Sequence, residues 1–134
     1  MGAVEYLLDT HALLWAAQEK RKLGDNAQKV MKDESTTIYV SAMSAYEITN
    51  KYRIGKLPGY EYVVENYADI LVKLDVVELP LNTQHAHYAS KFEWDHRDPF
   101  DRMLAAQAFI DDLVLITNDP VFQTLSWVNR KHIG

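Results

Sequence analysis

The hydrophobic positions of the chain alternate between short compact runs and longer runs with the spacing of amphipathic helices. The short runs are rich in Val, Ile, Leu and Tyr, which favour strands. They predict four strands, at residues 5–9, 37–40, 76–79 and 113–117. Because a helical segment separates each strand from the next, we expect βαβ crossovers and a mainly parallel sheet. The predicted fold is an α/β, three-layer α/β/α sandwich with a mainly parallel central sheet.

The helical runs are preceded by residues that are typical of helix N-termini. Helices are predicted over residues 11–18, 25 to about 32, 42–54, about 61–74, about 83–92 and 99–110. Thr10, Asp25 and Ser41 are expected to cap the first three of these helices. Asp98 followed by Pro99 is typical of an N-cap and a first-turn proline. No linker or internal repeat divides the sequence, so we interpret residues 1–134 as one domain.

Acidic residues stand near the carboxyl ends of the predicted strands. They are Asp9 after the first strand, Glu47 in the helix after the second, Asp101 in the helix before the fourth, and Asp119 after the fourth. In an open parallel sheet this edge is where ligands bind. Each acid is embedded in apolar sequence, where a carboxylate is costly unless a cation meets it. The sequence therefore predicts that these four carboxylates share one site.

Each acid also has a local explanation. These are a solvated strand end for Asp9, an ion pair with Lys51 or a capping box with Ser44 for Glu47, a favourable helix dipole for Asp101, and a turn or cap for Asp119. Asp98 is better explained as an N-cap than as a ligand. One shared site explains four acids at once, whereas the local explanations must all hold independently.

Composition and charge narrow the chemistry. With 48% hydrophobic residues the chain can fill a core. The 14 Lys and Arg against 19 Asp and Glu give a net charge of −5, which excludes generic electrostatic binding of nucleic acid but not an enzyme that holds RNA locally around a metal. There is no cysteine, so disulfides, thiolate nucleophiles and cysteine zinc sites are excluded. The absence of a basic leader and of an apolar run of about 20 residues predicts a cytoplasmic protein with no membrane partner.

Four close carboxylates would repel one another strongly, so either some of them protonate or a divalent cation holds them together. Oxygen ligands without Cys or His favour Mg²⁺ or Mn²⁺ over zinc. Such a site suits phosphoryl transfer.

Four motifs in order carry a family resemblance: LLDTHALLW, SAMSAYEI, HRDPFDRMLAAQA and LITND. With them the chain resembles PIN domains, most closely the VapC-type toxins of toxin-antitoxin pairs. The resemblance implies a Mg²⁺- or Mn²⁺-dependent endoribonuclease in which Asp9, Glu47, Asp101 and Asp119 are the catalytic, metal-binding acids. It also implies supporting roles for Thr10, Ser41, Thr117 and Asn118, with Asp98 as a second candidate beside Asp101. A metal-activated water would hydrolyse RNA, leaving a 5′-phosphate and a 3′-hydroxyl; a cognate antitoxin and a homodimer are the implied protein partners.

Basic residues and histidines add weaker candidates. Arg97 and Arg102 flank the acids and are candidates for RNA contacts or salt bridges. His85 and His87 point in different directions on a helix, so we interpret them and His96 as surface histidines and not as a zinc site.

Three alternatives remain. A haloacid-dehalogenase-like phosphatase needs a second Asp where His11 stands, and a receiver domain needs an acid pair and a late Lys that are missing. A PIN-like scaffold that binds protein or RNA without catalysis would retain the same acids.

Overall fold

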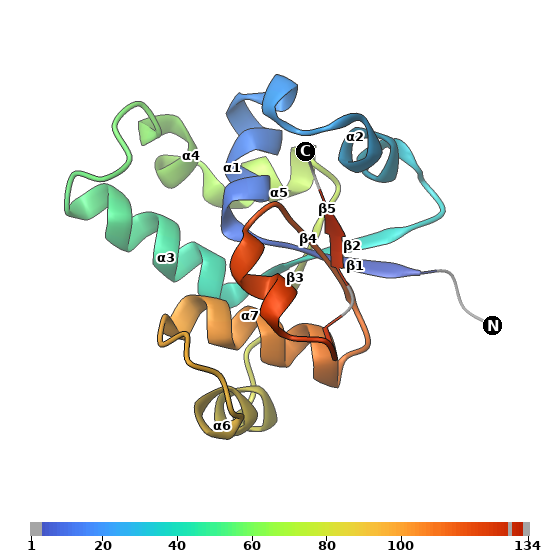
Figure 1. The fold of residues 1–134 in the computed structure, drawn as a ribbon. Coiled ribbons are helices and arrows are strands. Elements are labelled where there is room, and N and C mark those ends of the chain that lie inside the picture. The colour runs from blue at the N-terminus through green and yellow to red at the C-terminus, as the bar shows by residue number, and fades with distance from the viewer. Residues whose placement is uncertain (1–3, 129, 133–134) are drawn as a thin grey trace.

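The computed structural model describes residues 4–128 and 130–132, which form a five-stranded sheet flanked by helices (Figure 1). The strands are β1 (Glu5–Leu8), β2 (Thr37–Ser41), β3 (Val77–Leu79), β4 (Val114–Thr117) and β5 (Arg130–His132). Their order in the sheet is β3-β2-β1-β4-β5, and every neighbouring pair is parallel. The predicted parallel sheet is therefore confirmed.

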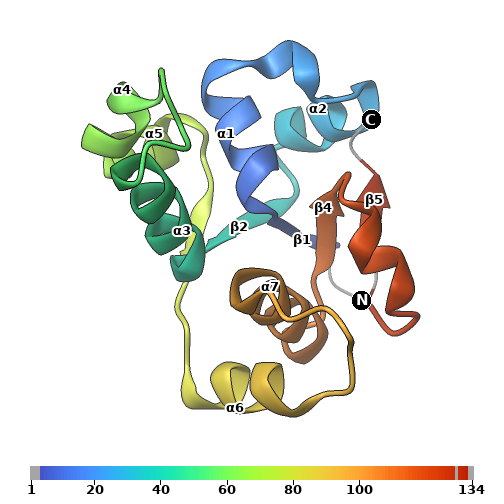
Figure 2. The ribbon, with the colours of Figure 1, turned by 60° about the vertical axis from the view of Figure 1, so that its left-hand side comes forward.

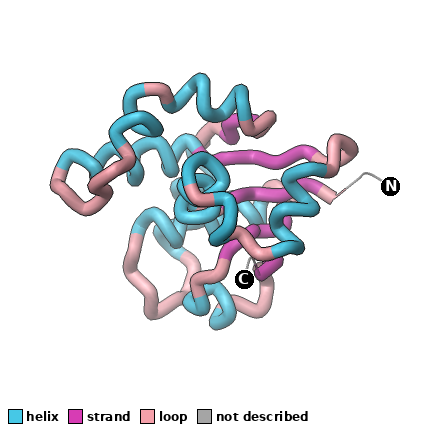
Figure 3. Tube along the Cα trace, turned by 90° about the horizontal axis from the view of Figure 1, so that it is seen from above, coloured by secondary structure: helices cyan, strands magenta, loops and turns pink. Residues whose placement is uncertain are grey.

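Helices cover both faces of this sheet (Figure 2). They are α1 (Thr10–Gln18), α2 (Asp25–Lys32), α3 (Ala42–Arg53), α4 (Glu61–Glu65), α5 (Tyr67–Lys73), α6 (Thr83–Lys91) and α7 (Pro99–Ile110), with short 3₁₀ turns η1 (Lys20–Lys22) and η2 (Pro120–Thr124). Figure 2 shows α1 and α2 on one side of the strands and α6 and α7 on the other, and Figure 3 shows the strands lying side by side. The α/β/α sandwich is confirmed.

Two hydrophobic cores follow from the alternation of side chains along the strands. Leu8 and Ile116 pack in one core with α1, α2 and residues of α3 to α5. Their neighbours Leu7 and Leu115 point to the other face, against α7 and η2. Central parallel strands are buried on both faces, which is why the strand segments are almost continuously apolar.

Several expected boundaries were wrong. Helix α1 is capped by Asp9 and not by Thr10, because the Asp9 carboxylate accepts the Ala12 N–H at 2.7 Å. Asp25 is the first residue of α2, and Gly24 occupies the cap position. The segment expected as one helix over about 61–74 is divided into α4 and α5 at Asn66, whose side chain donates to the Tyr62 carbonyl.

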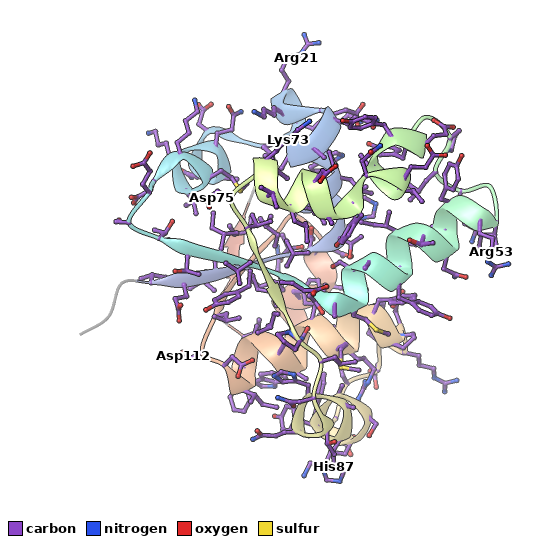
Figure 4. All side chains as sticks on the ribbon, turned by 180° about the vertical axis from the view of Figure 1, so that it is seen from behind. Arg21, Arg53, Lys73, Asp75, His87 and Asp112 are labelled. Carbon is purple, nitrogen blue, oxygen red and sulfur yellow. The ribbon has the colours of Figure 1, made fainter. Side chains whose placement is uncertain are left out.

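The fifth strand was not predicted, since β5 contains only Arg130, Lys131 and His132, a polar triplet without a strand signal. Two sharp turns lead into strands: Asp75 before β3 and Asp112 before β4 have φ values of 55° and 54°. Aspartate is among the few residues that tolerate this left-handed backbone. Both residues are exposed, and Figure 4 labels them.

Within residues 4–128 and 130–132, no helix has the length and apolar character needed to cross a membrane.

Candidate active site

Residues that follow β1 and β4, together with residues of α1, α3 and α7, surround a cavity of about 140 Å³. Its lining consists of Asp9, Thr10, His11, Glu47, Lys51, Asp98, Asp101, Leu104 and Asp119. All four acids predicted from the strand ends are among these residues. The parallel sheet therefore brings together carboxylates that are up to 110 positions apart, from 9 to 119, in the chain.

Asp9 is a buried carboxylate, only 5% exposed, directly after β1. Its backbone N–H donates to the Ile116 carbonyl at 3.0 Å, which fixes the residue between β1 and β4. Burial raises the pKa of Asp9, although hydrogen bonds from Thr117 and from the Ala12 N–H partly oppose this rise; nearby Asp119 adds to it. A cation in the cavity would favour the charged form of Asp9.

Glu47 is also buried, 6% exposed, and lies in the second turn of α3. Its Oε2 pairs with the Lys51 Nζ at 2.6 Å, so the local ion pair considered from the sequence is present. The capping box with Ser44 is absent, because Ser41 caps α3 and the Ser44 hydroxyl bonds to the Thr10 hydroxyl at 3.0 Å. Lys51 also lines the cavity, so it is a site residue and not only a helix-surface partner.

Asp101 lies in the first turn of α7, and its Oδ2 is 2.7 Å from His96 Nε2. Burial raises the pKa of Asp101 to about 6; the hydrogen bond from His96 opposes this rise, and the charges of Asp98 and Asp119 add to it. Asp98 is the predicted N-cap: its Oδ1 accepts the N–H groups of Phe100 and Asp101.

Asp119 is exposed and caps η2, since its Oδ1 accepts the Val121 N–H at 3.0 Å. Its own N–H donates to the hydroxyl of Thr117, which is buried at the end of β4. Thr117 therefore connects Asp119 with Asp9. Asn118 is exposed, and the hydrogen bonds of the described residues include none from its side chain.

The expectation that Arg102 contacts RNA is not supported by its surroundings. Its guanidinium donates to four backbone carbonyls, those of Ala89, Phe92, Trp94 and His96. Since a guanidinium has five N–H donors, little capacity is left for a phosphate. Arg102 supports the segment that leads into α7.

The interpretation of all three histidines as surface residues was wrong for His85. The side chain of His85 is 1% exposed, and Nε2 lies 2.8 Å from Asp111 Oδ2. Its Nδ1 accepts the Asn82 N–H in the capping box of α6. His87, two residues further on, is exposed and points away from the molecule in Figure 4.

His96 is the site residue that sequence reasoning missed. His96, Asp98 and Asp101 each offer a ligand atom, and these atoms lie within 4.8 Å of one another, the only such group of three among residues 4–128 and 130–132. The signal that could have found His96 is its place in HRDPFD, five residues before Asp101.

The residues of the cavity fit a hard divalent cation. Five carboxylates line it, Asp9, Glu47, Asp98, Asp101 and Asp119, against one lysine, which leaves an excess of 5 − 1 = 4 potential negative charges with histidine neutral. Oxygen donors of this kind suit Mg²⁺ or Mn²⁺. Within the protein, Lys51 pairs with Glu47 and the His96 ring is hydrogen-bonded to Asp101.

Together, the fold and site define an α/β domain with an acidic centre at the carboxyl edge of a parallel sheet. The family model described as PIN domain matches residues 6–128, and the chain therefore belongs to the PIN domain family. A comparison with curated proteins by sequence finds no match.

Solved structures share the fold. DNA-bound VapBC from Salmonella typhimurium aligns with a TM-score of 0.72 and 18% identity, covering 98% of this chain and 100% of that chain. VapBC2 from Rickettsia felis, bound to a promoter DNA fragment, aligns with a TM-score of 0.67 and 16% identity, covering 98% of this chain and 100% of that chain. VapBC-1 from nontypeable Haemophilus influenzae aligns with a TM-score of 0.63 and 17% identity, covering 96% of this chain and 98% of that chain. At these identities the likeness concerns the fold.

Proposed function

We propose that this PIN domain is a Mg²⁺- or Mn²⁺-dependent endoribonuclease and the toxin of a toxin-antitoxin pair, acting in the cytoplasm. The observation that carries the proposal is the single cavity in which Asp9, Glu47, Asp101 and Asp119 meet. Family membership supports a nuclease over the phosphatase and receiver alternatives. The similarity to solved toxin-antitoxin complexes supports an antitoxin partner.

Each side chain has a distinct part in this proposal. Asp9, Glu47 and Asp101 would hold the cation, with Asp119 completing the acidic rim. Bound there, the divalent ion would neutralise phosphate oxygens and lower the pKa of a water molecule. Lys51, which is one-third exposed at the cavity, is placed to contact a phosphate of the RNA. Thr10 is hydrogen-bonded to the Ser44 hydroxyl, Ser41 caps the helix that carries Glu47, and Thr117 accepts the Asp119 N–H.

Cleavage of RNA in the presence of Mg²⁺ or Mn²⁺ is the direct test. We expect product formation that EDTA abolishes, and a loss of more than about a hundredfold in Asp9→Asn, since changing even an outer partner of a metal ligand costs about 10–100-fold. Asn retains the cap of α1, so the variant should fold. Asp69→Asn, an exposed change on α5, is the control and should cleave normally.

Two results would reject this function. Cleavage that persists unchanged in EDTA would exclude the metal mechanism, and absence of cleavage by a folded, metal-loaded protein on all RNA substrates would favour the non-catalytic scaffold.

For the toxin role, expression of the wild-type chain alone should slow growth, whereas Asp9→Asn should not. The proposed homodimer is tested by light scattering of the purified chain.

A further inference from the structure

The segment between α6 and α7, residues 92–98, has no regular secondary structure, yet it brings His96 into contact with Asp101, one of the acids that line the cavity. We call it the 92–98 connection. Such a segment has no neighbouring strand or helical turn to bind its carbonyl groups. Its position must therefore come from other contacts.

Arg102 supplies these contacts from the first turns of α7. Its Nε donates to the Ala89 carbonyl at 2.8 Å, and Nη1 donates to the carbonyls of Trp94 and His96 at 3.1 and 2.9 Å. Nη2 bonds the Phe92 carbonyl, and the guanidinium carbon lies 4.4 Å from the centre of the Phe92 ring. One side chain thus contacts the end of α6 and three residues of the connection.

Trp94 anchors the same connection from its other side. Its indole N–H donates to the Thr124 hydroxyl at 2.7 Å, which joins the connection to η2, the turn capped by Asp119. The Trp94 ring also contacts the His96 ring, with centroids 4.9 Å apart. The imidazole of His96 is consequently held from both its backbone and its ring.

The outcome of this arrangement is one defined contact, from His96 Nε2 to Asp101 Oδ2 at 2.7 Å. We propose that Arg102 and His96 are positioning residues: Arg102 holds the 92–98 connection so that His96 fixes one carboxylate oxygen of Asp101 and leaves the other for the divalent ion. This inference rests on the proposed function. Residues that orient a ligand in this way are worth about 10–100-fold in metal affinity.

The choice of arginine is part of the inference. A planar guanidinium presents donors in several fixed directions, whereas the lysine ammonium is a single point with three donors. Lys at 102 could keep the charge and the packing of the stem but could not reach four carbonyls at once. The HRDPFDR sequence therefore holds four functional residues within seven positions: the positioning residues His96 and Arg102, the helix cap Asp98 and the metal-binding candidate Asp101.

The test measures binding of Mn²⁺ to the full chain by electron paramagnetic resonance, without RNA. We expect His96→Ala to weaken binding about 10–100-fold and His96→Gln, which retains an N–H donor, to recover part of the loss. Arg102→Lys should weaken binding by about tenfold. Arg21→Ala is the matched control, because Arg21 is an exposed arginine in η1 and does not line the acidic cavity; it should bind Mn²⁺ like the wild type.

The outcomes separate this inference from the proposed function. If the wild type binds Mn²⁺ no better than Asp101→Asn does, the metal site itself is wrong. If Asp101→Asn loses binding while His96→Ala binds like the wild type, the positioning role is overturned, even if Arg102→Lys unfolds. Strong nitrogen coupling from a directly bound imidazole would also overturn it, because His96 would then be a ligand.

Discussion

Helix α7 has a histidine–aspartate pair at each end, and the two pairs have nearly the same contact. His96 and Asp101 meet at 2.7 Å at its amino end, and His85 and Asp111 meet at 2.8 Å at its carboxyl end. Seen as isolated contacts, they are equivalent. Their surroundings differ in every other respect.

At the carboxyl end the polar groups are paired among themselves. His85 uses both ring nitrogens, one toward the Asn82 N–H and one toward Asp111. A cavity of about 340 Å³ lies beside it, and its other carboxylate, Glu5, accepts the Tyr39 hydroxyl at 3.2 Å. Both carboxylates that line this cavity, Glu5 and Asp111, therefore have a hydrogen-bond partner in the protein.

At the amino end the acids outnumber their partners. Asp101 shares its cavity with four other carboxylates, and burial together with Asp98 and Asp119 raises its pKa despite His96. The comparison shows that a histidine–aspartate contact does not itself define a functional site. What distinguishes the amino end is the excess of carboxylates around the contact.

The largest difference is expected in catalysis. Asp101→Asn should lower RNA cleavage by more than about a hundredfold, because it removes a proposed metal ligand, whereas an outer partner alone is worth about 10–100-fold. Asp111→Asn should leave cleavage close to that of the wild type. Single-turnover rates at saturating Mn²⁺ measure both, and equal losses in the two variants would end the distinction between the two ends of α7.

For the free energy of unfolding, a substitution at the carboxyl end of α7 should cost more than one at its amino end. His85→Ala removes a fully buried ring and leaves the Asn82 N–H without its partner, so the free energy of unfolding should fall by about 2–4 kcal/mol. His96→Ala, a substitution at a ring that is 31% exposed, should cost less than about 1 kcal/mol. Urea denaturation of both variants provides the comparison, with the exposed His87→Ala as control; a larger loss at His96 would contradict it.

The smallest expected effect is a pH dependence of the metal-free protein. The folded-state pKa of Asp101 is raised to about 6 from 3.8, so the folded chain holds this proton more tightly than the unfolded chain does. Its contribution to stability is therefore present below pH 3.8 and is lost as pH rises to about 6. In EDTA, the free energy of unfolding of Asp101→Asn should be close to that of the wild type near pH 4 and should exceed it by about 3 kcal/mol at pH 7, because each of the 6 − 3.8 = 2.2 pKa units is worth about 1.4 kcal/mol. A difference that does not change with pH would show that Asp101 carries no such penalty.

Residue type and spacing predicted the elements whose signals are local. Asp98 and Ser41 cap their helices as expected, because a side-chain oxygen that bonds an N–H two or three residues ahead needs no distant partner. The meeting of Asp9, Glu47, Asp101 and Asp119 could also be predicted, since parallel strands place their carboxyl ends at one edge. Strand β5 carried no hydrophobic signal and was missed.

The contacts that sequence could not predict involve backbone carbonyls or the far end of another element. The local sequence around Arg102 does not indicate that its side chain binds four carbonyl oxygens of residues 89–96. The burial of His85 likewise depends on the packing of α6 against α7 and on Asp111, 26 positions away. Such partners are defined only when the tertiary structure forms.

Asp9, Asp98 and Asp119 each line the cavity and also cap the element that follows. A saturation library selected for folding alone would therefore enrich Asp, Asn, Ser and Thr at these positions. Adding a demand for cleavage should reduce that set to aspartate. Selection for fold alone thus already supplies oxygen donors at the site.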